Sequence, residues 1–318
     1  MMKKLVSLVL ALMLCLSCVS ALAAEAWTVT CPWAPSGVAA MVNQKAASLS
    51  TTYSQDYVLV ANAEKGDTAT INSWLTKYTE ADPQMCFIGE GMFGITAILD
   101  PERMNFTYDD FEYVENLYSS IFVASARKEL GITSIDALKA YLEEGNQIMV
   151  GTNGATGSEA FLAAALIGAM GYGDQFYLIP YESAAEAAQA VARGEVDIAV
   201  SHQSQILETW QQGGVDVFAA FDGEPIAQGP FKGVEGVGQY GYPYFRNRCF
   251  IFAKAGADEQ KIADLKALYA QILTDEEMVD WLNNTMLLEA DMMTEEEVIA
   301  HIDNVKNIVD EYYDLVAE

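Results

Sequence analysis

Residues 151–170 hold the residue types best suited to binding a small molecule. Their sequence, GTNGATGSEAFLAAALIGAM, places a Gly-rich turn before an apolar helix, so the backbone can fold tightly and aim free N–H groups at a ligand. A helix start of this kind attracts an anion. The predicted contacts of such a ligand are Asn153, Thr156, Gly157 and Ser158.

The same turn has a competing interpretation without a ligand. Thr156 and Glu159 fit a capping box, in which the glutamate takes part of the same donor set. The turn lacks the lysine of a P-loop and does not match the G-x-G-x-x-G dinucleotide pattern, so we expect neither a nucleotide ligand nor a nucleotide cofactor.

Ser158 and His202 are residue types of a hydrolase. Ser158 lies outside a G-x-S-x-G elbow, however, and no acid is placed to orient His202, so we expect no enzyme. His202 instead follows a predicted strand, at the carboxyl edge where α/β folds bind ligands. The two histidines, His202 and His301, and the scattered cysteines show no metal-ligand spacing, so we expect no metal and no cofactor.

Three further candidate contacts lie in turns beside predicted strands. Trp33, in the turn PWAPSG, could stack on a ligand or plug the space between two domains. Tyr181 precedes a capped helix, and its hydroxyl either reaches a cleft or packs at the surface. Glu90, in the turn Gly-Glu-Gly, is either a contact of an ammonium or hydroxyl group or a solvated turn residue.

The first 24 residues have the layout of a secretory signal. Lys3 and Lys4 precede an apolar run that ends in small residues. Cys18 is an alternative lipidated first residue, although Cys15 replaces the aliphatic residue of a lipobox. We expect an exported protein, periplasmic or extracellular, with a lipid anchor at Cys18 as the alternative.

The charge of the chain limits its partners. The 318 residues carry a formal net charge of −28 at neutral pH, which repels nucleic acid and anionic membranes. An anion site must therefore use oriented donors at short range. Cys31, Cys86 and Cys249 lie in apolar runs and are expected to be core residues. We expect a monomer without a nucleic-acid partner.

Strands and helices alternate along the chain, which predicts an α/β fold with parallel sheets. The predicted strands are residues 27–31, 57–61, 85–88, 121–125, 147–151, 176–180, 196–201, 215–221 and 248–253. The predicted helices are residues 38–50, 68–78, 135–144, 157–170, 184–193, 203–211, 258–273, 275–283 and 295–315. No element is assigned to the acidic, aromatic residues 106–118. The predicted division is a signal peptide at 1–24, domain I at 25–121 and 222–318, and domain II at 122–221.

The order of short motifs resembles the receptor family of tripartite tricarboxylate transporters, also called the Bug or tricarboxylate-binding receptors. The stretch PWAPSGVAA is similar to the family's P-[FW]-x-P-G-G-x-x-D loop, with Ala40 in place of the aspartate. Residues 155–162, ATGSEAFL, and the later Ile-Pro-Tyr ending at Tyr181 are similar to G-x-G-S-x-x-H-L and V-P-Y, with Phe161 in place of the histidine. The chain therefore resembles a divergent member of this family.

The resemblance implies a periplasmic-binding-protein-like type II fold, in which two domains with mainly parallel sheets close on a small carboxylate. Backbone N–H groups of two loops would hold it, and by position these belong to Ser36, Gly37, Val38, Thr156, Gly157 and Ser158. It also implies delivery to the large and small integral membrane subunits of a tripartite transporter. Because Ala40 and Phe161 depart from the pattern, the ligand stays open among a carboxylate, a hydroxy acid and an amino acid. The functional alternatives are an extracytoplasmic sensor for a signalling system and a small-molecule hydrolase.

Overall fold

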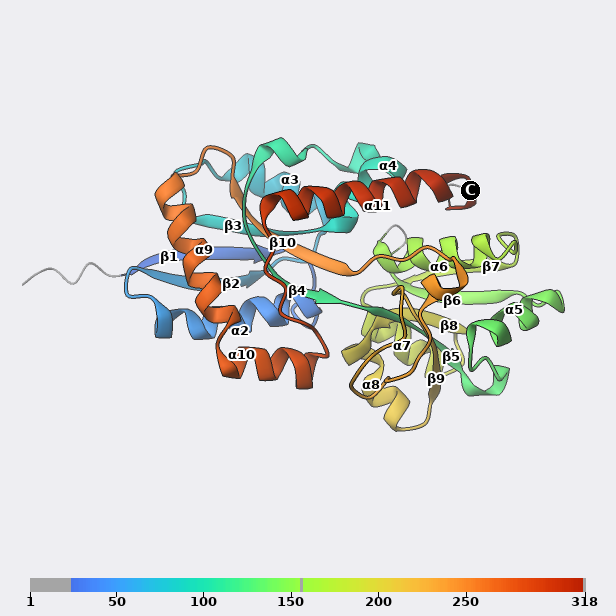
Figure 1. Cartoon of the computed structure of the whole chain (residues 1–318). Coiled ribbons are helices and arrows are strands. Elements are labelled where there is room, and N and C mark those ends of the chain that lie inside the picture. The colour runs from blue at the N-terminus through green and yellow to red at the C-terminus, as the bar shows by residue number, and fades with distance from the viewer. Residues whose placement is uncertain (1–23, 155–156, 317–318) are drawn as a thin grey trace, which may run out of the picture.

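The structure, a computed structural model, describes residues 24–154 and 157–316. Its strands form two five-stranded sheets, each flanked by helices (Figure 1). The predicted signal peptide, the cysteine proposed for lipidation and Thr156 lie outside the described residues, apart from Ala24.

The first sheet has the strand order β2-β1-β3-β10-β4. Strand β1 pairs in parallel with β2 and β3, whereas β10 is antiparallel to both of its neighbours, so four of the five strands run in one direction. The strands are β1 Glu25–Cys31, β2 Tyr57–Ala63, β3 Gln84–Gly89, β4 Phe111–Ser120 and β10 Asn247–Lys254.

The second sheet repeats this plan in the order β7-β6-β8-β5-β9. Here β5 is the single antiparallel strand, between β8 and β9. The strands are β5 Phe122–Arg127, β6 Ile148–Asn153, β7 Phe176–Tyr181, β8 Ile198–His202 and β9 Val215–Ala220. In each sheet the antiparallel strand is the one that arrives from the other sheet. The expected α/β fold with mainly parallel sheets is confirmed, while the division at residues 121 and 221 into domains stays a prediction.

Helices cover both faces of the first sheet because its strands are apolar on both sides. In β3, Phe87 packs in one core cluster while Cys86 and Ile88 pack in another on the opposite face. One face carries α2 (Val38–Tyr53), α9 (Glu259–Leu273) and α10 (Glu276–Asp280), and the other carries α3 (Thr68–Lys77) and the start of α11 (Glu295–Val316). The three described cysteines are buried and free, which confirms them as core residues.

The second sheet is covered by α5 (Ile135–Glu143) and α6 (Ser158–Ala169) on one face and by α7 (Ala184–Ala192) and α8 (Gln203–Gln211) on the other. Helix α11 is shared between the two sheets (Figure 1). Its residues Val298 and Ile302 pack in a core cluster of the first sheet, whereas Val305 and Val309 pack with α6 in a cluster of the second. The two sheets are therefore joined by a common helix as well as by two chain passages.

Strand β4 is the element that the sequence pattern missed. It occupies Phe111–Ser120, within and beyond the stretch to which no element was assigned. All its residues except Glu112 are buried. Because neither face of the strand is exposed to solvent, the sequence FEYVENLYSS lacks the alternation of polar and apolar residues by which a half-buried strand is predicted. Its polar members are held by hydrogen bonds, such as the one from the Asn116 amide to the Asp291 carbonyl.

Candidate functional site

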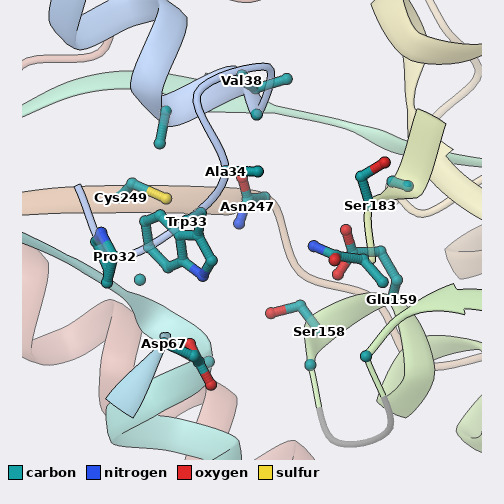
Figure 2. A pocket seen from close by; sticks show the side chains of 18 of the residues that line it. Pro32, Trp33, Ala34, Val38, Asp67, Ser158, Glu159, Ser183, Asn247 and Cys249 are labelled. Atoms are coloured by element: carbon teal, nitrogen blue, oxygen red, sulfur yellow. The ribbon is translucent and has the colours of Figure 1, made fainter. Parts of the chain in front are cut away.

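A cavity of about 450 Å³ lies between the two sheets. Its wall is formed by the segments that follow β1, β2, β3, β6 and β7 and by the end of β8, which are the carboxyl ends of all six parallel-paired strands. This is the edge at which open α/β sheets bind ligands. Figure 2 shows Trp33, Asn247 and Cys249 on one side of the cavity and Ser158, Glu159 and Ser183 on the other.

Most of the predicted contacts meet in this cavity although they are distant in sequence. Its lining includes Trp33, Gly37, Val38, Glu90, Asn153, Gly157, Ser158, Tyr181 and His202. Ser36 is exposed and lies outside the wall that the described residues form, and Thr156 is not among the described residues. Contact of each residue with a ligand stays a prediction.

Five helices begin at the cavity wall. The N-caps of α2, α6, α7 and α8 are Gly37, Gly157, Ser183 and His202, each with an extended backbone, and the N-cap of α3 is Asp67. The first N–H groups of a helix have no partner inside the helix, and the helix dipole makes this end positive. The first turns of α6 and α7 contain an acidic residue, whereas that of α2, which begins Val-Ala-Ala-Met, does not. The first turn of α8 also lacks an acidic residue, and α3 has the acidic N-cap Asp67. The start of α2, where Gly37 and Val38 both line the cavity, is therefore suited to an anion.

Glu90 is completely buried, and hydrogen bonds fix its carboxylate in the wall. Oε1 accepts from Asn247 Nδ2 at 2.9 Å and from Ser158 Oγ at 3.0 Å, and Oε2 accepts from the Arg248 backbone N–H at 2.8 Å. Burial raises the pKa of Glu90, and these donors oppose the rise. Because Ser158 begins α6 while Glu90 follows β3, the hydrogen bond between them links the two halves of the cavity.

Glu159, the residue after Ser158, is 6% exposed and lines the cavity. Burial raises its pKa to about 7; its own backbone N–H and a hydrogen bond from Asn153 lower the value, while the charges of Glu90 and Asp67 raise it. Glu159 thus takes one donor at the start of α6, its own backbone N–H. The N-cap of α6 is Gly157 without a side-chain cap, so Glu159 is not at the third position that the predicted capping box requires, and Thr156 lies outside the described residues.

The basic side chains of the cavity wall already face carboxylates. Lys65, after β2, forms a 2.8 Å ion pair with Glu182, after β7, and Arg103 Nη2 lies 3.3 Å from Asp67. The Lys65–Glu182 pair is a second link between the two halves, although both side chains are mostly exposed and such pairs contribute little to stability.

Ser158 and His202 both line the cavity but do not form a catalytic pair in the described structure. Ser158 Oγ donates to Glu90, and His202 Nδ1 lies 2.8 Å from Ser120 Oγ. The imidazole packs against Phe122, and burial lowers the pKa of His202 to about 3, which keeps the ring neutral. Ser158 and His202 are therefore not joined as the nucleophile and base of a hydrolase relay.

Several lining residues were not predicted, because nothing in their local sequence marks them. They are Lys65, Asp67, Arg103, Glu182, Ser183, Gln205, Asn247 and Cys249, among others. Asn247, at the start of β10, is typical: only the antiparallel return of this strand between β3 and β4 brings it to Glu90.

Within residues 24–154 and 157–316, no group of three or more His, Cys, Asp or Glu side chains is arranged to hold a metal ion. Over the same residues, no helix combines the length and apolar character that crossing a membrane requires.

A sequence model of the tripartite tricarboxylate transporter family receptor matches residues 55–307, well over half of the chain. The chain belongs to this receptor family. A sequence comparison with curated proteins found no match. The match covers the motifs at residues 155–162 and 179–181, despite Phe161, whereas the first motif, with Ala40, precedes the matched residues.

Solved structures of similar fold include other proteins of this kind. Rpa4515 of R. palustris, with adipate, is 15% identical with a TM-score of 0.80, over 91% of this chain and 96% of that one. The periplasmic binding protein BugD is 16% identical with a TM-score of 0.78, over 92% and 98%. MatC of Rhodopseudomonas palustris, with bound malate, is 17% identical with a TM-score of 0.75, over 92% and 98%. These structures share the two-sheet fold, which confirms the expected type II architecture.

Proposed function

We propose that this receptor binds a small organic acid in the cavity between its two sheets and delivers it to the membrane subunits of a tripartite transporter. The observation that carries the proposal is the convergence of the starts of α2, α6 and α7 on one cavity. A volume of about 450 Å³ suits a small metabolite. Family membership and the adipate and malate of the similar receptors support a carboxylate ligand.

The carboxylate of the ligand would bind at the start of α2. Gly37 and Val38 line the cavity there, and the helix dipole favours a negative group without a basic side chain. Since the chain as a whole is strongly acidic, such short-range donors are the means by which it can hold an anion. Trp33 and Tyr181, from opposite halves, would enclose the ligand.

The proposal includes the location, the oligomeric state and the chemical role of the receptor. The receptor is exported through the signal at residues 1–24, with lipidation at Cys18 as the alternative, and acts outside the cytoplasm as a monomer. It is not an enzyme: Ser158 and His202 contribute to the wall of the binding cavity and carry out no reaction.

Native mass spectrometry of the purified protein tests the receptor function most directly. We expect a copurifying small acid, and a panel of organic acids and amino acids should contain members that raise the melting temperature. A ligand at 100 times its Kd stabilises the folded state by about 2.7 kcal/mol. Absence of both a copurifying molecule and any shift across the panel would contradict the proposal.

A further inference from the structure

We propose that the ligand carries a protonated amine in addition to its carboxylate, and that the Glu159 carboxylate receives this amine. The inference rests on the proposed receptor function and specifies the chemical class of its ligand. It starts from the acidic side chains of the cavity wall, which are Asp67, Glu90, Glu159 and Glu182.

Two of these carboxylates are paired with basic side chains, and a third is held by several neutral donors. Asp67 pairs with Arg103, and Glu182 pairs with Lys65. Glu90 is held by the Asn247 amide, the Ser158 hydroxyl and a backbone N–H group.

Glu159 has fewer donors than Glu90: its own backbone N–H and the Asn153 amide. Among the described residues no basic side chain lies within ion-pair distance of Glu159, and the charged groups that act on it, Glu90 and Asp67, are themselves acidic. Glu159 is nevertheless buried, with 6% of its surface exposed, and its carboxylate points into the cavity (Figure 2). A buried carboxylate of this kind gains most from a cation supplied by the ligand.

The cavity wall also contains hydrogen-bond acceptors that lack donors. Asn247 Oδ1 and Gln205 Oε1 are buried and have no hydrogen-bond partner in the described structure. An ammonium group brings three N–H donors, whereas an ionised carboxylate brings none. A ligand composed only of carboxylates would therefore leave these acceptors unpaired and place like charge beside Glu159.

The starts of the helices divide the cavity into an anion side and a cation side. At α6, one of the first backbone N–H groups, that of Glu159, already donates to the Glu159 carboxylate. At α2, the first turn contains no acidic residue and its donors are available to the carboxylate of the ligand. A small molecule with a carboxylate for the start of α2 and an ammonium group for Glu159 would match both ends of the cavity. An amino acid carries these two groups.

The proposal also sets the pH dependence of binding. The charged, titratable and polar groups that face Glu159 are the Asn153 amide, the carboxylates of Glu90 and Asp67, the Cys249 thiol and its own backbone N–H. An ammonium group requires Glu159 to be ionised, so the affinity for an amine-bearing acid should rise as the pH passes upward through about 7. A plain dicarboxylate bound by a protonated Glu159 would show the opposite trend.

The test uses the full mature protein, calorimetric titration and pairs of acids that differ in one amine: glutamate and glutarate, aspartate and succinate, and 4-aminobutyrate and butyrate. We expect at least one amine-bearing member to bind about tenfold more tightly than its partner, the lower range for a hydrogen bond to a charged group. Glu159→Gln should remove this preference. Glu296→Gln is the matched control, because it removes the same charge from an exposed first-turn position of α11, and it should leave the preference unchanged.

Other outcomes would overturn the proposal. Equal or tighter binding of the dicarboxylates, or an amine preference that survives Glu159→Gln, would show that Glu159 does not receive an amine. Amine-reactive labelling of the molecule released from denatured protein provides a second measurement, and a copurified ligand without an amine would refute the inference while leaving the receptor function intact. If no acid of either class binds and none copurifies, the receptor function itself fails, and this inference fails with it.

Discussion

Ser158 Oγ donates a 3.0 Å hydrogen bond to Glu90 Oε1, and this contact connects the first turn of α6 to the turn after β3. The two residues are far apart in the chain and belong to different sheets. Since the carboxylate is buried and further held by Asn247, the serine hydroxyl meets a fixed acceptor. The hydrogen bond therefore favours the arrangement in which the two halves enclose the cavity.

Removing the hydroxyl should weaken ligand binding. Ser158→Ala leaves Glu90 with one donor fewer, and a hydrogen bond to a charged group contributes about 1.5 to 3 kcal/mol, so we expect the Kd to rise by about tenfold or more. Calorimetric titration with the copurified ligand measures the effect. Ser48→Ala, at an exposed position of α2, is the control. Equal affinity of the Ser158 variant and the control would show that the contact is incidental to binding.

A methyl group at Gly91 should displace the Ser158 hydroxyl from Glu90 and so weaken the link between the two halves. A Cβ added there would lie 2.7 Å from Ser158 Oγ, although the backbone of Gly91, with φ −61°, accepts alanine. Overpacking of this kind costs about 1 to 3 kcal/mol, so Gly91→Ala should weaken binding by about tenfold.

Small-angle scattering of this variant at saturating ligand should show a larger radius of gyration than that of the parent protein. Gly173→Ala, where the nearest atom to the added Cβ lies at 3.9 Å, should behave like the parent. A Gly91 variant that binds and closes normally would mean that Ser158 and Gly91 separate without loss.

The backbone donors at the start of α2 can be tested with one residue. Val38 is the first residue of the helix, where proline is tolerated, and the N-cap Gly37 before it is extended, as a residue preceding proline should be. Val38→Pro should therefore remove one N–H group while α2 still forms, and weaken carboxylate binding by about tenfold. Val38→Ala keeps the N–H group and serves as the control. Similar affinities of the two variants would place the carboxylate elsewhere.

The free energy of unfolding of the ligand-free protein should depend on pH, because ionising the buried Glu159 costs free energy. The pKa of Glu159 is raised to about 7 in the folded state, above the value of about 4.3 for an unfolded glutamate. The folded state thus holds the proton more tightly, and the contribution of this group to stability falls as the pH rises between these two values.

The Glu159→Gln variant has no titrating proton at this position. Its stability relative to the parent should therefore increase as the pH rises from about 4.3 to about 7, by up to about 3 kcal/mol at about 1.36 kcal/mol per pKa unit. Urea unfolding of both proteins without ligand, at about pH 5 and about pH 8, measures the difference. A constant difference between the two proteins would mean that Glu159 is not the group that titrates near neutrality.

Much of the fold follows from local sequence patterns. The apolar runs around Val29, Val150 and Val200 predict strands that pair in parallel. The structure contains these parallel pairs, because each strand is followed by a helix that returns the chain along the sheet. Strand β4 escaped prediction because both of its faces are buried, so that its polar residues, including Glu115 and Asn116, obscure the pattern.

The cavity was predictable only where a turn directly follows a parallel strand. Trp33, Glu90 and Gly157 occupy such turns, and their positions at the carboxyl edge follow from the topology alone. Asn247 and Gln205 could not be found in this way, because their places in the wall depend on tertiary contacts. The sequence also suggested Glu90 as the acid that meets the ligand, but its hydrogen bonds to Asn247 and Ser158 could be seen only in the structure.

Helix α11 constrains how this receptor can move. A Cβ at Gly94 would lie 2.5 Å from Val305 Cγ1, so the helix is seated closely against the first half, while Val305 and Val309 also pack with the Ala- and Leu-rich surface of α6. The two halves cannot simply swing apart without exposing this apolar seam. Opening should instead proceed largely as shear, with α6 sliding along α11, and the length of shared helix sets how far the cavity can open.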